Sequence, residues 1–328
     1  MGQGKRLVLF ATGGTIATRL DADGRAVPVL GGAELLAALP PLPGVESVDI
    51  VEVSRLGSAE LTVQGMFDLA KRVDEALEDY DGAVITQGTD TLEESCYLFD
   101  LVLATDKPVV FTAAMRGADD AGADGTRNLW SALTVAAAER AQGFGVLVVF
   151  GDEIFAAVDA TKTHTASTAG FTAPGRGPLG FVVPARQHTV LLHRSLMRQT
   201  VPANGVAADV PIVSAALGAD PNLLRAALAG DATGIVIEAL GTGNLPPDWE
   251  PAVRAAVAAE VPVVLASRVH DGPLLDHYAY PGGGARLAEA GALFAQGLNA
   301  GKARIKLMLA LTVNRDPRYL RELFEYLY

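Results

Sequence analysis

Short apolar runs alternate with turn residues and with longer amphipathic stretches along most of the chain. Most of the apolar runs are continuous, which is typical of parallel strands that are covered on both faces of a sheet. They lie at residues 7–11, 48–53, 83–86, 109–112, 146–150, 211–213, 235–237 and 261–266. Helical patterns fall between them, at residues 63–80, 92–103, 127–140, 222–228, 249–258 and 302–312. This alternation predicts an α/β fold with mostly parallel sheets.

The alternation breaks at residues 188–210, which contain Pro202, Asn204 and Gly205 and have no strong hydrophobic periodicity. The chain has 328 residues, about twice the usual size of a domain. We therefore expect a larger N-terminal domain over residues 1–190, a linker over 191–210 and a smaller C-terminal domain over 211–328.

The net charge of the chain limits the classes of molecule that it can bind. The chain carries 26 Lys and Arg residues against 38 Asp and Glu residues, a formal net charge of −12. Such a surface repels phosphate backbones, which argues against a nucleic-acid-binding protein.

Cysteine and histidine usage argues against a metal or disulfide framework. Cys96 is the single cysteine, so no internal disulfide can form. The five histidines contain no i,i+4 pair that would place two metal ligands on one helix face. No apolar run approaches the ~18 residues of a membrane span, and the apolar run at 7–11 is too short for a signal peptide. We expect a cytoplasmic protein that uses no metal and no cofactor.

Two polar clusters follow predicted strands, where ligand sites form in open parallel sheets. Residues 11–17, Ala-Thr-Gly-Gly-Thr-Ile-Ala, carry two glycines and the hydroxyl of Thr15. A plain turn or a phosphate cradle would also explain them, although both phosphate-binding glycine motifs are missing. Residues 85–94 carry Thr89, Asp90 and Thr91 at a predicted helix start. Asp90 and Glu93 have the spacing of a capping box, but a hydroxyl beside free helix amides is also suited to oxyanion chemistry.

For two further clusters, the spacing alone favours a structural role over a catalytic one. Lys162 lies among threonines at residues 159–165, and most lysines are solvated surface charges. A partly buried Lys162 near Thr89 could instead accept a hydroxyl proton. His164 is expected to be a hydrogen-bonded scaffold residue. Arg116, after the strand at 109–112, is expected to pair with an aspartate such as Asp119 or Asp124.

Together, these segments resemble the bacterial-type L-asparaginase family. Thr-Gly-Gly-Thr-Ile-Ala at 12–17, Thr-Gln-Gly-Thr-Asp-Thr-Leu-Glu-Glu at 86–94 and Thr-Lys-Thr-His-Thr at 161–165 carry the resemblance. The Ala-Ala-Met-Arg, Asp-Gly and Gly-Thr-Gly-Asn-Leu segments at 113–116, 124–125 and 241–245 fit it as well. The motifs occur in order along nearly the whole chain.

The resemblance implies hydrolysis of L-asparagine to L-aspartate and ammonia through a threonine acyl-enzyme. Thr15 becomes the nucleophile, and Thr89, Asp90 and Lys162 form a second group that moves a proton at a threonine hydroxyl. Ser58 would bind the substrate α-carboxylate and Asp90 its α-ammonium. The remaining substrate-binding positions that it implies are Gly14, Gly57, Gly88, Ala114 and Asn244.

The resemblance also implies the assembly: a homodimer that pairs into a homotetramer, with each site completed by the C-terminal domain of a partner.

Three features of this sequence depart from better-known members. Residues 18–30 lack a lid tyrosine, Ala59 replaces a glutamine, and residues 276–281 lack a glutamate that reaches the partner's substrate. We expect Tyr278 or Tyr280 to fill part of the role of that glutamate.

Two other functions stay open at this point. A relative that hydrolyses glutamine, or another amide, differs only in pocket shape, which is worth about 1–3 kcal/mol of discrimination. A relative acting on glutamyl-tRNA is disfavoured by the acidic charge. A catalytically silent amino-acid-binding protein would explain the missing lid tyrosine, but not the retention of Thr15, Thr89, Asp90 and Lys162.

Overall fold

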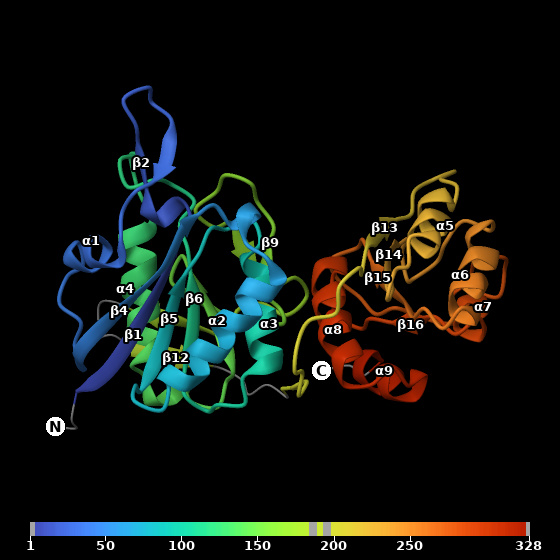
Figure 1. Cartoon of the computed structure of the whole chain (residues 1–328). Coiled ribbons are helices and arrows are strands. Elements are labelled where there is room, and N and C mark those ends of the chain that lie inside the picture. Colours follow the sequence, from blue (N-terminus) through green and yellow to red (C-terminus); the bar gives the residue numbers. More distant parts are fainter. Residues whose placement is uncertain (1–3, 184–188, 193–197, 326–328) are drawn as a thin grey trace. The chain divides into compact units, whose positions relative to one another are not determined.

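A computed structural model describes residues 4–183, 189–192 and 198–325 (Figure 1). The chain divides into two compact units, Met1–Thr200 and Val201–Tyr328. Each unit is an α/β domain, as the hydrophobic pattern predicts. Among the described residues, no helix is long and apolar enough to cross a membrane.

The first unit is built on an eight-stranded sheet with the order β12-β11-β8-β7-β6-β5-β1-β4. Its parallel part consists of β1 (Lys5–Gly13), β4 (Val45–Leu56), β5 (Gly82–Thr86), β6 (Val109–Thr112) and β7 (Val146–Phe150). All five correspond to predicted apolar runs. The strands β8 (Glu153–Ala156), β11 (Gly180–Val183) and β12 (Thr189–Leu192) extend it in antiparallel fashion and were not predicted.

Helices cover both faces of this sheet (Figure 1). On one face, α4 (Gly125–Ala136) packs on the strands, and its Leu129 and Leu133 join a buried core with Leu9 and Val84. On the other face lie α2 (Val63–Ala76) and α3 (Leu92–Val102), where Phe99 meets Phe111 edge to face at 4.9 Å between ring centroids. Burial on both faces explains why the strands read as unbroken apolar runs.

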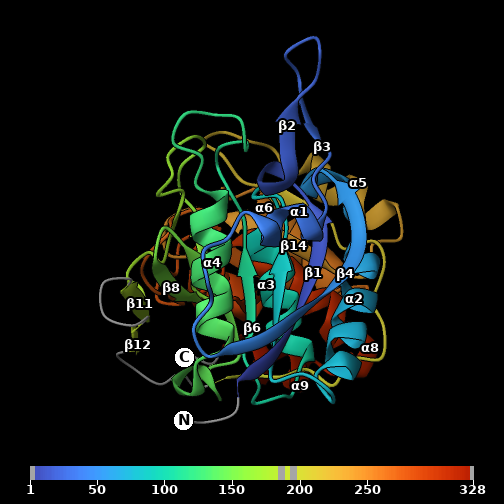
Figure 2. The same ribbon diagram turned by 90° about the vertical axis from the view of Figure 1, so that its left-hand side faces the viewer.

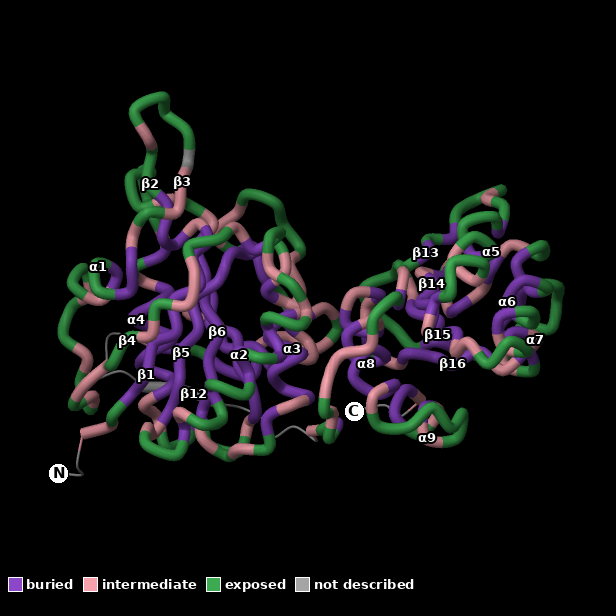
Figure 3. Tube along the Cα trace, in the orientation of Figure 1, coloured by how far each residue is buried: buried purple, intermediate pink, exposed green. Residues whose placement is uncertain are grey.

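Several short elements complete the first unit. The hairpin of β2 (Thr18–Leu20) and β3 (Ala26–Pro28) projects from the end of the sheet in both ribbon views (Figures 1 and 2). Its tip is exposed (Figure 3). The others are η1 (Thr15–Ala17), α1 (Gly32–Ala37), η2 (Ser58–Glu60), η3 (Glu139–Ala141), β9 (Thr161–Lys162) and β10 (Phe171–Thr172).

The second unit has a parallel sheet with the order β13-β14-β15-β16. Helix α8 (Ala300–Val313) lies on one face, and α5 (Asn222–Ala229), α6 (Trp249–Ala258) and α7 (Gly284–Glu289) lie on the other (Figure 1). The strands are β13 (Ile212–Ser214), β14 (Ile235–Ala239), β15 (Val263–Ser267) and β16 (Leu293–Phe294), and α9 (Pro317–Phe324) closes the described chain. Three strands and three helices match predicted segments; β16, α7 and α9 were not predicted.

The linker expected over residues 191–210 is shorter in the structure. Its first two residues belong to β12, and residues 193–197 lie outside the described part of the chain. At its other end, Val201 and Val210 are buried, and Ala207 donates from its amide to the carbonyl of Met308 on α8. Residues 201–210 therefore pack into the second unit, although their polar and turn residues are typical of a linker.

Arg198 fastens the end of the first unit to α3. Its guanidinium donates to Asp100 Oδ1 at 3.1 Å and to the carbonyls of Asp100, Leu103 and Thr105. Asp100 also accepts from the amide of Val146 at 2.9 Å, and its side chain is 10% exposed. The attraction of Arg198 opposes the rise in the pKa of Asp100 that burial causes.

We predict that Arg198→Ala lowers the free energy of unfolding of the first unit by about 3–5 kcal/mol, because it leaves a buried carboxylate unpaired. The measurement is urea unfolding followed by Trp130 fluorescence in a Trp249→Phe background, which removes the second of two tryptophans. Lys5→Ala is the control, because its pair with Asp81 is partly exposed and should contribute less than about 1 kcal/mol. Equal losses in both variants would contradict this account.

Candidate active site

Three loops meet at the carboxyl ends of the neighbouring strands β4, β1 and β5. Gly14 has φ +82°, and a Cβ atom there would lie 2.3 Å from the amide nitrogen of Gly88. A Cβ on Gly88 would in turn lie 2.8 Å from Ser58 Oγ. Because no side chain fits at either glycine, the backbones of the three loops pack directly on one another.

Thr15 begins directly after this contact, in the single turn η1. The turn is closed by the amide of Ala17, which donates to the carbonyl of Gly14 at 3.0 Å, and the hydroxyl of Thr18 donates to the same carbonyl at 3.0 Å. The Thr15 side chain lines a cavity of about 540 Å³. Gly14, Gly57, Ser58, Gly88, Thr89 and Asp90 also line this cavity. Sequence positions 14–15, 57–58 and 88–90 therefore line one cavity.

Lys162 reaches the edge of this site from β9. Its ammonium group donates to Thr89 Oγ1 at 2.9 Å and to Asp90 Oδ1 at 2.7 Å, and its side chain is 19% exposed. The amide of Lys162 donates to Glu93 Oε2 at 2.7 Å. The interpretation of Lys162 as a solvated surface lysine is therefore wrong, because spacing alone cannot show that β9 returns to the start of α3.

The capping box that the spacing of Asp90 and Glu93 suggests does not form. The residue at the N-cap of α3 is Thr91, whose side chain makes no capping hydrogen bond. Asp90 and Glu93 bind Lys162 instead, through its ammonium group and its amide respectively. Asp90 and Glu93, although they are spaced like the two ends of a capping box, hold Lys162 in place.

Ser58 connects the second loop to the third. It is 3% exposed, and its hydroxyl accepts a hydrogen bond from the amide of Asp90 at 3.0 Å. Its carbonyl accepts from the hydroxyl of Thr91 at 2.9 Å. The hydroxyl hydrogen of Ser58 remains able to bind an acceptor such as a carboxylate.

Ala114 is fully buried and its neighbour Met115 lies on the cavity wall, and the role expected for the Ala114 carbonyl stays a prediction. The pairing expected for Arg116 does not form within the described residues: its guanidinium donates to the carbonyls of Ala121 and Gly122. Asp124 accepts from the backbone amides of Met115 and Arg116 instead, because the strand-end turn brings those amides to it.

His164 is a scaffold residue, as predicted. Its Nδ1 accepts hydrogen bonds from the amides of Ala166 at 3.0 Å and Ser167 at 2.8 Å. It therefore shapes the loop that carries Lys162.

The sequence interpretation missed part of the cavity wall. Arg19, Leu20 and Pro28 contribute from the β2–β3 hairpin, and Asp119 and Asp120 from the loop after β6. Asp119 accepts from the amide of Leu20 at 3.1 Å and lies 3.9 Å from Arg19 Nε. The position of this loop at a strand end was a signal that could have identified it.

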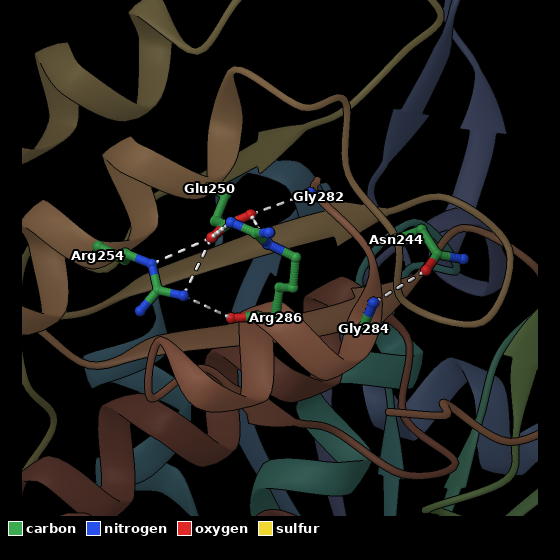
Figure 4. Close-up of polar contacts among 6 residues, drawn as sticks. All are labelled: Asn244, Glu250, Arg254, Gly282, Gly284 and Arg286. Atoms are coloured by element: carbon green, nitrogen blue, oxygen red, sulfur yellow. Dashed lines mark hydrogen bonds and ion pairs between the residues drawn. The ribbon is translucent and has the colours of Figure 1, made fainter. Parts of the chain in front are cut away.

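Asn244 belongs to the second unit, where it binds the backbone (Figure 4). Its Oδ1 accepts from the amide of Gly284 at 3.1 Å, and its Nδ2 donates to Thr242 Oγ1 at 3.3 Å. These two hydrogen bonds of Asn244 fix a turn of the second unit.

Glu250 forms a second anchor for the same turn (Figure 4). Its side chain is 5% exposed, and it accepts from Arg286 at 2.7 and 2.9 Å, from Arg254 at 3.1 and 3.2 Å and from the amide of Gly282 at 3.2 Å. The hydrogen bonds from Arg286, with those from Gly282 and Arg254, lower the pKa of Glu250 to about 2 against the opposing effect of burial.

Among the described residues, no group of three or more His, Cys, Asp or Glu side chains could hold a metal ion. His188 and His193 lie outside the described part of the chain. The site contains hydroxyls, one lysine and carboxylates, which is a set of groups suited to nucleophilic and acid–base chemistry.

Comparisons with known proteins identify the family. Residues 6–196 match the family model "Asparaginase, N-terminal", and residues 209–324 match "Glutaminase/Asparaginase C-terminal domain". The chain belongs to the asparaginase family.

Relatives match over nearly the full length. A "Probable L-asparaginase" of Deinococcus radiodurans is 40% identical over 97% of both chains. An "L-asparaginase" of Bacillus licheniformis is 33% identical over 95% of this chain and 97% of its own. The crystal structure of a "Probable Cytoplasmic L-asparaginase" from Campylobacter jejuni superimposes with a TM-score of 0.87 at 27% identity, covering 98% of this chain and 100% of that chain. The family resemblance and the two-domain α/β fold are thereby confirmed.

The low pKa of Glu250 predicts an acid-sensitive contribution to stability. A depressed carboxyl pKa stabilises the fold fully above the unfolded value of 4.5, and the contribution is lost as the pH falls toward about 2. The difference in free energy of unfolding between the wild type and Glu250→Gln should therefore shrink from pH 5 to pH 2. Trp249 fluorescence in a Trp130→Phe background reports on this unit.

The control is Glu322→Gln, which changes the net charge equally at an exposed position of α9. A wild-type-minus-variant difference that stays constant for Glu250→Gln across this pH range would contradict the assignment.

Proposed function

We propose that this protein hydrolyses the side-chain amide of L-asparagine to give L-aspartate and ammonia. The observation that carries the proposal is the contact of Lys162 Nζ with Thr89 Oγ1 and Asp90 Oδ1, at the rim of the cavity that Thr15 lines. Membership of the asparaginase family and the names of the two bacterial relatives support the choice of substrate.

Thr15 is the proposed nucleophile. Its hydroxyl oxygen attacks the amide carbon and its proton passes to the leaving nitrogen. Ammonia departs, and the acyl group stays bound to Thr15 as an ester. Water then attacks the ester, which releases aspartate and restores the hydroxyl. Splitting amide hydrolysis into two steps in this way lowers each barrier. Within the described residues the Thr15 hydroxyl makes no hydrogen bond, so it is available to the substrate.

Lys162 and Thr89 are the proposed proton-transfer pair. A hydroxyl becomes a good nucleophile when a base takes its proton. Lys162 Nζ lies 2.9 Å from Thr89 Oγ1, so the neutral amine form of this lysine would accept the Thr89 proton directly. The β2–β3 hairpin contains no tyrosine. Lys162 and Thr89 would therefore activate the site without a tyrosine. The amides at Gly88–Thr89 would bind the oxyanion, and the Ala114 carbonyl would orient the leaving amide or the water.

Substrate binding divides the charges of the amino acid between two loops. The Ser58 hydroxyl, beside Gly57, would donate to the α-carboxylate, and Asp90 would bind the α-ammonium. The second unit of a partner copy would complete the site with Tyr278 or Tyr280, with Asn244 holding that segment. The functional form would be a homodimer that pairs into a homotetramer in the cytoplasm, without a cofactor.

Glutamine is the alternative substrate, because the matching C-terminal family is described as glutaminase/asparaginase. Rejecting one methylene contributes about 1–3 kcal/mol, so the same site could accept both amides at different rates.

Thr15→Ala is expected to reduce ammonia release from L-asparagine at least about a thousandfold, because it removes the nucleophile. Thr15→Ser should retain part of the activity, since it keeps a hydroxyl. Both amides are compared side by side at equal protein concentration. Turnover by Thr15→Ala at the wild-type rate would refute the mechanism, and wild-type release from glutamine alone would reverse the choice of substrate.

A further inference from the structure

Exposed aromatic rings gather on an irregular segment of the second unit. Tyr278 and Tyr280 are 41% and 50% exposed. The His277 and Tyr278 rings lie 3.9 Å apart, and the Tyr278 and Tyr280 rings 5.4 Å apart, between centroids. Exposed rings in a contiguous group mark a binding surface more often than scattered ones do.

The segment, residues 276–283, is folded tightly although it contains no helix or strand. The amide of Gly283 donates to the carbonyl of Tyr280 at 2.7 Å, and the amide of Ala285 donates to the carbonyl of Tyr278 at 3.0 Å. A Cβ on Gly283 would lie 2.4 Å from the Tyr278 carbonyl oxygen, and one on Gly284 would lie 2.3 Å from that of Leu275. The segment therefore packs backbone against backbone in one conformation.

Glu250 holds the end of this segment from α6. It binds the amide of Gly282 and both nitrogens of Arg286 that face it, and Arg286 lies on α7, which follows the segment (Figure 4). Asn244 binds the next position, Gly284. One buried carboxylate thus fixes both the turn after Tyr280 and the first helix beyond it.

The energetics of such a network favour a role in conformation over one in stability. Burying a carboxylate is costly, and hydrophobic residues of similar volume often replace a buried ion pair without loss. A fully hydrogen-bonded network selects one arrangement of the groups around it. Fixing a surface in its bound conformation before binding removes the cost of ordering it later.

We propose that Glu250 is a positioning residue, which fixes residues 276–284 so that Tyr278 and Tyr280 meet the asparagine bound by a second copy of this chain. The inference rests on the proposed function. It adds the internal support of the aromatic segment to the groups already placed in the site.

The experiment compares the KM and kcat of wild type, Glu250→Gln and a Tyr278→Phe/Tyr280→Phe variant for ammonia release from L-asparagine. Glu250→Gln is expected to raise KM about tenfold and to leave kcat within about twofold, because it loosens a substrate contact and leaves Thr15 and Lys162 in place. Combining it with the two tyrosine changes should raise KM by less than the product of the separate effects, because all act through one segment.

Glu322→Gln, at an exposed position of α9, is the matched control and should change neither constant. A purely structural role for Glu250 predicts that kcat falls with the active fraction, that KM stays constant and that the combined effects multiply; this pattern would overturn the proposal. If Glu250→Gln does not fold, Arg286→Gln takes its place, because it leaves the contacts of Glu250 with Arg254 and Gly282.

The proposed function and the positioning role of Glu250 can be refuted separately. A wild-type protein that releases no ammonia from asparagine refutes the proposed function and this inference with it. A wild-type protein that turns over asparagine, together with an unchanged KM in the Glu250 or Arg286 variant, refutes this inference alone.

Discussion

The backbone of Gly14 lies against the backbone of Gly88, and this contact determines where every other group of the first unit's site can be. A Cβ on Gly14 would come within 2.4 Å of both the N and Cα atoms of Gly88. Such a distance excludes any side chain, and the backbone at Gly14 has a φ angle that L-residues rarely adopt. Because Thr15 follows Gly14 and Thr89 follows Gly88, one contact brings two hydroxyls to the wall of a single cavity.

The electrostatics of the site depend on the same arrangement. Ser58 receives the amide of Asp90 and so fixes the loop that presents the Asp90 carboxylate to Lys162. Glu93 fixes the backbone of that lysine. The lysine is mostly shielded from water, and two acidic residues and one threonine hold it in place. A group restrained in this way transfers a proton with little reorganisation, which is the advantage that preorganised sites have over free solution.

Much of the fold was predictable, because burial on both faces leaves a direct signal in the sequence. The five parallel strands of the first sheet read as continuous apolar runs. The antiparallel extension was missed at β8, although Gly151 and Asp152 have φ +58° and +69° and form the tight turn that begins it. Glycine with aspartate between two apolar runs is a hairpin signal.

The site was predictable in its residues but not in its contacts. Strand ends identified Thr15 and Thr89, whereas the partners of Lys162 depend on β9 returning to the start of α3, which no local pattern encodes. Spacing suggested a capping role for Asp90 and a side-chain ion pair for Arg116, and tertiary contacts override both. The support that Glu250 gives to Gly282 joins residues 32 positions apart, and only the fold shows it.

The most direct test of the account compares Gly14→Ala with Gly44→Ala. Gly44 has φ +79°, close to the +82° of Gly14, but a Cβ there would meet no atom within 4 Å. Both variants therefore place an alanine at a positive φ, and only Gly14→Ala disturbs the contact with Gly88. We expect kcat/KM for L-asparagine to fall at least about a hundredfold in Gly14→Ala, as for a misplaced reacting group, and to stay within about twofold in Gly44→Ala. Equal activities in the two folded variants would contradict the claim that this contact places the nucleophile.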